Sequence, residues 1–238
     1  MLRLEQLSCG YGQFRAVDEL SFNVERGGVF ALVGANGAGK SSTIMAIAGH
    51  VEIQGGRILL DGEDISRMPV RERVRAGIAL APEGRRLFPD LSVEENLLIG
   101  GYTRSRQESA STQSKVFELF PRIAERRKQA AGSLSGGEQQ MVAIGRAMMA
   151  EPKLLMIDEV SLGLMPKMVD ICYQAIRSLK DEGTTILLVE QSTQRALEIS
   201  DQVCVLESGR TVWQGAASEA RNDPALIEAY LGVREKAS

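Results

Sequence analysis

Short apolar runs and longer amphipathic stretches alternate along the chain, and this pattern predicts an α/β fold. Val29–Val33 is a continuous apolar run, typical of a strand buried on both faces of a sheet, and it leads through glycines into a helical stretch, Lys40–Ala48. Three further apolar runs predict strands: residues 154–157, 185–189 and 203–206. A predicted helix over residues 168–180 separates the first two. We therefore expect a mainly parallel sheet with right-handed crossovers.

The first sixty residues predict a small antiparallel β portion in front of that sheet. Residues 2–7 and 17–24 have the composition of short strands, and the glycines of residues 10–12 mark a turn between them. Residues 58–60 predict an edge strand, which ends at the Asp61-Gly62 turn.

Residues 85–150 are expected to be mainly helical. Ser92, followed three residues later by Glu95, has the pattern of a capping box before a helix. Residues 114–120 predict another helix, which Pro121 stops. The 238 residues suit one domain. We expect its core and antiparallel portion in residues 1–84 and 151–238, with a helical subdomain inserted as residues 85–150.

Composition narrows the class of protein. Hydrophobic residues make up 44% and charged residues 25% of the chain, which excludes a disordered or fibrous protein. The net charge of −3 argues against nucleic acid as a partner. Two local basic patches are expected to be solvated helix faces: Arg71, Arg73 and Arg75, and Arg126, Arg127 and Lys128.

The cysteines and the absence of long apolar runs indicate where the protein works. Cys9, Cys172 and Cys204 match neither a metal pattern nor a disulfide framework, so a reducing cytosol is expected. No charged-then-apolar leader opens the chain, and no apolar run approaches the ~20 residues that span a bilayer. Any work at a membrane is therefore expected to go through a partner.

A glycine-rich loop between the first buried strand and its helix predicts a phosphate site. Residues 34–41 read GANGAGKS and fit the pattern G-x-x-x-x-G-K-[ST]. The glycines allow backbone N–H groups to converge on phosphate oxygens in front of a helix N-terminus. Lys40 is expected to reach the β- and γ-phosphates and Ser41 to bind Mg²⁺ through its hydroxyl. The candidate nucleotide ligands of this segment are Gly34, Ala35, Asn36, Gly37, Ala38, Gly39, Lys40, Ser41 and Ser42.

Two carboxylates follow the apolar run of residues 154–157. In an open α/β sheet, acids at the C-terminal end of a buried strand lie at the ligand crevice. Asp158 is expected to bind Mg²⁺, and Glu159 to orient and deprotonate the attacking water. Alone, this motif is weak evidence for a catalytic site. Together with the phosphate loop, it is strong evidence for one.

A third motif, LSGGEQQ, occupies residues 134–140 and precedes a predicted helix over residues 141–150. Ser135 and Glu138 form a capping-box pattern, so the segment has an explanation as a well-started helix. Gly136 and Gly137 indicate a role beyond starting a helix. Glycines weaken a helix, so they are expected at its start only where the backbone must approach another group closely. An exposed, glycine-lined helix start is an anion site, and it would suit the γ-phosphate of a nucleotide held by another subunit.

These three motifs, in this order, resemble those of the ABC-transporter ATPases, and the resemblance covers essentially the whole chain. It implies a P-loop NTPase core that uses ATP and Mg²⁺. It also implies a head-to-tail dimer in which each ATP lies between one subunit's residues 34–41 and the other's Ser135, Gly136 and Gly137. Tyr11 occupies the place of the family's adenine-stacking aromatic, although a turn tyrosine is the alternative. Residues 161–164 match the loop that touches the other subunit.

Two replacements narrow the resemblance. Glu83 stands where the family usually has a Gln that contacts nucleotide and metal, and Gln191 stands where it usually has a switch His. The single histidine, His50, is expected to be structural or on the surface. With PEGRRLFP, VEENL, SLGL and a late AYLG at residues 229–232, these features resemble one of the two ATPases of branched-chain amino-acid importers. Val160 departs from that subfamily, which usually has Pro there.

The resemblance implies ATP hydrolysis coupled to import of a small solute, with Lys40, Glu159 and Gln191 in catalysis. The implied partners are a second ATPase, identical or related, two membrane permease subunits and, indirectly, an external solute-binding protein. The chain would lie peripherally on the cytoplasmic face of the membrane. Alternatives are an importer ATPase for another solute such as urea or amides, or a soluble ATPase acting on nucleic acid or the ribosome. A monomeric P-loop kinase or GTPase leaves LSGGEQQ unexplained, and a degenerate regulatory cassette is disfavoured by the intact motifs.

Overall fold

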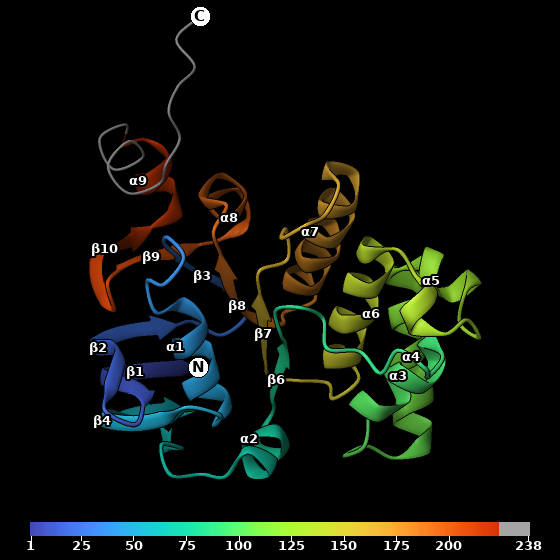
Figure 1. Ribbon diagram of the computed structural model, residues 1–238, viewed down its shortest axis with the longest axis horizontal. Helices are drawn as coiled ribbons and strands as arrows, with labels where there is room; N and C mark the ends of the chain where they lie inside the picture. The colour runs from blue at the N-terminus through green and yellow to red at the C-terminus, as the bar shows by residue number, and fades with distance from the viewer. Residues whose placement is uncertain (224–238) are drawn as a thin grey trace, which may run out of the picture. The chain divides into compact units, whose positions relative to one another are not determined.

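The computed structural model describes residues 1–223, which divide into two compact units (Figure 1). Unit 1 contains Met1–Val70 and the chain from Thr185 onward, and unit 2 contains Arg71–Thr184. The chain is α/β, as predicted, with a small antiparallel sheet and strands that pair mostly in parallel elsewhere. The predicted division into a core and a helical subdomain over residues 85–150 stays a prediction.

The antiparallel sheet of unit 1 has the strand order β2-β1-β4-β5. Its strands are β1 (Leu2–Tyr11), β2 (Phe14–Val24), β4 (Glu52–Leu60) and β5 (Glu63–Asp64). Leu4 pairs with Phe22 on one side and with Ile58 on the other, so three buried side chains come together across the sheet. The prediction of an edge strand at residues 58–60 was wrong, because β4 is longer and lies between β1 and β5. Its first half is mostly polar or glycine and carries no strand pattern.

A second set of strands in unit 1 has the order β10-β9-β3-β8. These are β3 (Val29–Val33), β8 (Thr185–Glu190), β9 (Gln202–Glu207) and β10 (Arg210–Ala216). β3 runs parallel to β8 and β9, and every residue of β3 and β8 is buried. The unit's helices are α1 (Lys40–Ala48), α8 (Thr193–Ile199) and α9 (Ala217–Arg221). Phe22 stacks on Phe30 with ring centroids 4.5 Å apart, which joins β2 to β3.

Unit 2 is built around one buried helix. Its elements are α2 (Val70–Ala76), β6 (Ile78–Ala81), α3 (Val93–Gly100), α4 (Arg106–Leu119), α5 (Pro121–Glu125), a 3₁₀ turn (Ala131–Ser133), α6 (Gly136–Met148), β7 (Leu154–Asp158) and α7 (Pro166–Asp181). Helix α6 packs against α3, α4, α5 and α7 and against both strands, which run parallel to each other (Figure 1). Gly145 allows this packing, because a Cβ there would lie 2.6 Å from a methyl group of Val116.

Several helices begin where side chains satisfy their first N–H groups. Ser92 and Glu95 form the predicted capping box of α3, and Ser105 and Glu108 form another at α4. The predicted helix at residues 114–120 is the end of α4, which starts eight residues earlier. Pro121 does end it, and then occupies the first turn of α5.

The basic patches differ from each other. Arg126, Arg127 and Lys128 are exposed, as predicted, but Arg73 is only 3% exposed, so a solvated face was the wrong expectation there. Burial lowers the pKa of Arg73 from its usual value.

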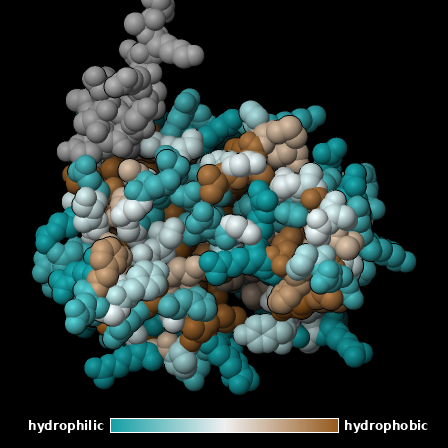
Figure 2. Space-filling view, in the orientation of Figure 1, coloured by the Kyte–Doolittle hydropathy of each residue, from teal (hydrophilic) through white to brown (hydrophobic). Residues whose placement is uncertain are grey.

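His50 is exposed, as expected. On the face shown in Figure 2, hydrophobic residues form separate small areas between hydrophilic side chains. Within residues 1–223, the helices are all too short or too polar to cross a bilayer.

The three cysteines are free and buried. Burial raises the pKa of Cys172 to about 12 and those of Cys9 and Cys204 to about 11, from an ordinary value of 9.0. We therefore expect the native protein to react negligibly with a thiol reagent such as Ellman's reagent at pH 8, and all three thiols to react after denaturation. Because folding retains these protons, the free energy of unfolding should fall as the pH rises above about 9. Rapid labelling of the native protein would contradict this expectation.

Candidate functional site

The glycine-rich loop of unit 1 leaves the C-terminal end of β3 and enters α1. Gly34 has φ 154°, and a Cβ there would lie 2.2 Å from the carbonyl oxygen of Leu206. Gly39 has φ 103°, and its Cβ would lie 2.7 Å from the carbonyl oxygen of Ala16. Only glycine fits these two positions without moving neighbouring backbone. The loop therefore has a conformation that the rest of unit 1 imposes.

Lys40 is the first residue of α1, and its side chain is only 4% exposed. Its Nζ donates hydrogen bonds to the carbonyl oxygens of Gly34 and Ala35, at 2.9 and 3.2 Å. No side chain caps the N-terminus of α1, and its first turn contains no acidic residue. The loop thus combines an ammonium group with the positive end of a helix dipole, which suits an anion such as a phosphate. Ala35, Asn36 and Gly37, at the tip of the loop, are exposed.

An aromatic pair lies at the end of the β1–β2 hairpin in the same unit. Tyr11 is 57% exposed and pairs in register with Phe14, which is 68% exposed. Gly10 is needed behind them, because a Cβ there would lie 1.9 Å from the carbonyl oxygen of Phe14. Phe14 was not predicted as a site residue. Tyr11 and Phe14 directly flank the two-residue turn at residues 12–13, and this position could have pointed to Phe14 as well.

Gln191 directly follows β8 and is exposed, whereas Glu190, the last residue of that strand, is fully buried. Because β3 and β8 are parallel, Gln191 and the glycine loop leave the same edge of the unit 1 sheet. The ends of parallel strands are where open α/β sheets bind ligands. The predicted role of Gln191 is consistent with this position.

In unit 2, the predicted carboxylates leave one edge of the β6–β7 pair. Ala81 pairs with Ile157 in parallel register, so Glu83 follows β6 by two residues, and Glu159 follows Ile157 by the same spacing. Asp158 is 1% exposed, Glu159 is half-buried and Glu83 is exposed. Glu159 has φ 51°, an uncommon backbone conformation for a non-glycine residue, of a kind that clusters at functional sites.

The start of α6 carries the third motif. Ser135 Oγ accepts a bond from the Glu138 N–H, and the Glu138 carboxylate accepts bonds from the Ser135 N–H at 3.0 Å and hydroxyl at 2.8 Å. Arg126 Nε lies 3.2 Å from the same carboxylate. Burial raises the pKa of Glu138, but these bonds and charges outweigh it and the net pKa lies below its usual value.

The two glycines of this motif have different environments. Ser135 is exposed and Gly136 half-exposed, but Gly137 is buried against Met168 of α7. A Cβ on Gly137 would lie 2.5–2.8 Å from the Cε, Cγ and Cβ atoms of Met168. The expectation of an exposed helix start lined by both glycines was therefore wrong for Gly137. Close packing inside unit 2 is sufficient to require glycine there.

Gly137→Ala should lower the free energy of unfolding by about 1–3 kcal/mol, because the added methyl group overpacks the contact with Met168. This cost exceeds the gain of up to about 1 kcal/mol that Ala brings to a helix interior. Gly136→Ala is the matched control, since its Cβ would meet only the guanidinium end of Arg85, at 3.2 Å or more. Urea unfolding measures both variants, and equal midpoints for the two would contradict this packing argument.

Taken together, a phosphate-binding loop between a buried strand and a helix and a buried strand ending in Asp-Glu define a P-loop nucleoside triphosphatase. A family profile described as "ABC transporter" matches residues 17–161, and the chain belongs to that family.

Three relatives are similar over nearly their whole length. The high-affinity branched-chain amino acid transport ATP-binding protein BraG of Pseudomonas aeruginosa is 44% identical, over 98% of this chain and 100% of its own. The probable branched-chain amino acid transport ATP-binding protein LivF of Archaeoglobus fulgidus is 38% identical, over 98% and 99%. The lipopolysaccharide export ATP-binding protein LptB of Haemophilus influenzae is more distant, at 30% identity over 99% of each chain.

Solved structures agree with this membership. An ATP-binding cassette of an ABC transporter in its ADP conformation has a TM-score of 0.86 and 28% identity, covering 98% of this chain and 99% of its own. The chain is thus an ATP-binding subunit that hydrolyses ATP, as predicted. The AYLG motif at residues 229–232 lies outside the described residues.

Proposed function

We propose that this chain hydrolyses MgATP to power uptake of a branched-chain amino acid through a membrane permease. The observation that carries the solute class is the 44% identity with BraG over nearly the full length of both chains. LptB, whose name describes an exporter, is similar over the same span at only 30% identity. Import of a branched-chain amino acid is therefore favoured over export.

Nucleotide binding would rest on unit 1. Backbone N–H groups of the glycine loop, the positive end of α1 and the Lys40 ammonium would hold the phosphates. Tyr11 and Phe14 offer exposed rings on which an adenine can stack. The exposed amide of Gln191 can donate a hydrogen bond to a phosphate oxygen and, unlike imidazole, does not titrate near neutral pH.

The hydrolytic step would use carboxylates of unit 2. Asp158 would supply a carboxylate oxygen, a hard donor of the kind that fits Mg²⁺, which usually keeps several waters and needs few protein ligands. In unit 1, the hydroxyl of Ser41 is a donor of the same kind. Glu83 is a further carboxylate on the same edge as Asp158. Glu159 would orient the attacking water and accept its proton. Bound Mg²⁺ would neutralise charge on the phosphates.

A head-to-tail dimer would complete each site. Ser135 is exposed and Gly136 half-exposed at the start of α6, so this helix start can receive the γ-phosphate of an ATP bound to a second subunit. Leu162 and Met165, in the loop after Glu159, are 49% and 70% exposed and suit contact with that subunit. The second subunit would be another copy or a related ATPase.

Membrane attachment would use exposed apolar residues near α3. Phe88, Leu98, Ile99 and Tyr102 are each 40–61% exposed. The guanidinium carbon of Arg146 lies over the ring of Phe88, 5.9 Å from its centroid. This cation–π contact helps to hold the aromatic side chain in place. The side chain of Asn96 on α3 bonds both the N–H and the carbonyl oxygen of Phe88. An exposed aromatic held in this way suits contact with a helix from a permease subunit. The chain would then lie peripherally on the cytoplasmic face, and a solute-binding protein would act on the other side.

Uptake of labelled leucine, isoleucine and valine by intact cells tests the proposal. Cells lacking this chain should lose most high-affinity uptake, and wild-type protein should restore it. Protein carrying Phe88→Ala should restore less, although its ATPase activity in solution stays near normal. Unchanged uptake of all three amino acids in cells lacking the chain would contradict the assigned solute class and leave the ATPase activity in place.

A further inference from the structure

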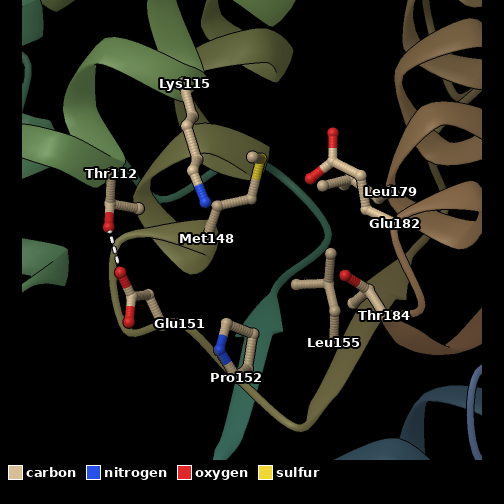
Figure 3. Close-up of a pocket in the computed structure, with 9 residues that line it drawn as sticks. All are labelled: Thr112, Lys115, Met148, Glu151, Pro152, Leu155, Leu179, Glu182 and Thr184. Atoms are coloured by element: carbon tan, nitrogen blue, oxygen red, sulfur yellow. Dashed lines mark hydrogen bonds between the residues drawn. The ribbon is translucent and has the colours of Figure 1, made fainter.

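A cavity of about 290 Å³ lies wholly within unit 2, and one of its lining residues, Leu155, belongs to the strand that ends in Asp158. Its walls come from α4, the C-terminal end of α6, β7 and the C-terminal end of α7 (Figure 3). Pockets for drug-sized ligands measure roughly 300–1,000 Å³. This cavity lies at the small end of that range and is therefore suited to a small molecule rather than to a nucleotide.

The wall of the cavity is partly apolar and partly polar. Met148 and Leu179, which are 8% and 6% exposed, and the fully buried Leu155 form its apolar part. They come from α6, β7 and α7, so three separate elements fix the shape of this part. A ligand that fills the cavity would cover aliphatic atoms on this part of the wall.

Two opposite charges face each other across the opening. Lys115 extends from α4 on one side, and Glu182 lies at the end of α7 on the other (Figure 3). Over residues 1–223, neither the Lys115 ammonium nor the Glu182 carboxylate takes part in an ion pair. Both groups are therefore available to a ligand.

The third charge at the cavity is already used within the protein. Glu151 accepts a hydrogen bond from the Thr112 hydroxyl at 2.5 Å and pairs with Arg104. The dashed line in Figure 3 marks the first of these contacts. Glu151 is thus held as part of the wall, and its charge is compensated by Arg104.

The end of helix α7 strengthens the preference for a cation on the side of Glu182. Helix α7 ends at Asp181, with Glu182 as its C-cap. The last carbonyl groups of a helix carry partial negative charge and favour a cation. An ammonium group would therefore be stabilised near Glu182, whereas Lys115 remains the partner for a carboxylate.

From this arrangement we infer that the cavity binds a small aliphatic α-amino acid. Its ammonium group pairs with Glu182, its carboxylate with Lys115, and its side chain covers Met148, Leu155 and Leu179. The matching charges on opposite sides of an aliphatic surface carry the inference. It is independent of the proposed function, because none of the residues proposed to bind ATP or Mg²⁺ or to catalyse hydrolysis lines the cavity.

A titration of the full chain, labelled with ¹³C at its methionine methyl groups, tests this inference by NMR. The Met148 signal is assigned by its loss in Met148→Leu. Leucine should shift this signal saturably. Two analogues of leucine, 4-methylpentanoate without the ammonium group and 3-methylbutylamine without the carboxylate, should bind about tenfold or more weakly, because each loses one charge-assisted hydrogen bond. Equal binding of leucine and both analogues, or no saturable shift with leucine, would overturn the inference.

Charge variants then assign the two ends of the ligand. Lys115→Ala should weaken leucine binding about tenfold and leave 3-methylbutylamine unchanged, and Glu182→Gln should weaken leucine similarly and leave 4-methylpentanoate unchanged. The matched controls are Lys128→Ala and Glu125→Gln, which remove exposed charges outside the cavity. Leucine affinity that stays at the wild-type value in both cavity variants would show that the charges do not recognise it.

Discussion

Glu159→Gln should lower the rate of ATP hydrolysis by about 10²–10⁴-fold and leave ATP binding nearly unchanged. Glutamine has the size of glutamate but cannot accept the proton of the attacking water. The side chain follows the fully buried strand β7 and the buried Asp158, and its backbone is left-handed, with φ 51°. Initial rates of phosphate release, together with a direct ATP-binding titration, separate the two effects.

Glu118→Gln is the matched control, because Glu118 is exposed on α4. With hydrolysis blocked, bound ATP should hold two subunits together, so Glu159→Gln should elute earlier than wild type from a sizing column when ATP is present. Undiminished turnover in Glu159→Gln would exclude this carboxylate as the base.

Lys40→Met should weaken ATP binding by about 10–100-fold, because it removes a charge-assisted contact to phosphate and keeps most of the aliphatic stem. The Lys40 ammonium also bonds the carbonyl oxygens of Gly34 and Ala35, so its loss releases the glycine loop as well. Hydrolysis at limiting ATP should fall by at least the same factor. A titration with a fluorescent ATP analogue measures the affinity.

Lys128→Met is the control for Lys40→Met, since Lys128 is an exposed lysine of unit 2 far along the chain from the glycine loop. Wild-type affinity in Lys40→Met would contradict the assigned role of the loop. Lys128→Met should bind ATP with wild-type affinity.

The parts of the fold that burial determines completely could be predicted from the sequence. β3 and α1 have the predicted bounds, because a strand buried on both faces is a continuous apolar run and glycines separate it from the helix. The candidate residues of the phosphate loop and of the Asp-Glu strand end could also be named from the sequence. The reason there is different: their chemistry is local, and short motifs specify it.

Other elements left no such pattern. β6 is an apolar run of only four residues, which does not distinguish a strand from a buried helix segment, and β10 is largely exposed and shows no apolar run. The first half of α4 is mostly polar, and only its capping residues, Ser105 and Glu108, mark where it begins. The burial of Arg73 also depends on distant packing that no local pattern reports.

Gly137 shows the same limit within the candidate site. Its sequence context predicted an exposed anion site, and the structure places Met168, which is thirty-one residues later, against it. Phe14 was missed because its exposure follows from the register of the β1–β2 hairpin, which pairs it with Tyr11. A contact between distant segments decided the position of Gly137, and the register of a hairpin decided that of Phe14.

The most direct test of the central conclusion is the rate of phosphate release from ATP by the purified full-length chain, with Mg²⁺ and after chelation by EDTA. We expect turnover in Mg²⁺, about 10²-fold or greater loss in EDTA, and recovery when Mg²⁺ is restored, because the metal neutralises charge that develops on the phosphates. Turnover per subunit should also rise with protein concentration if two subunits complete each site. Hydrolysis that persists at full rate in EDTA, or no hydrolysis at any protein concentration, would contradict the account.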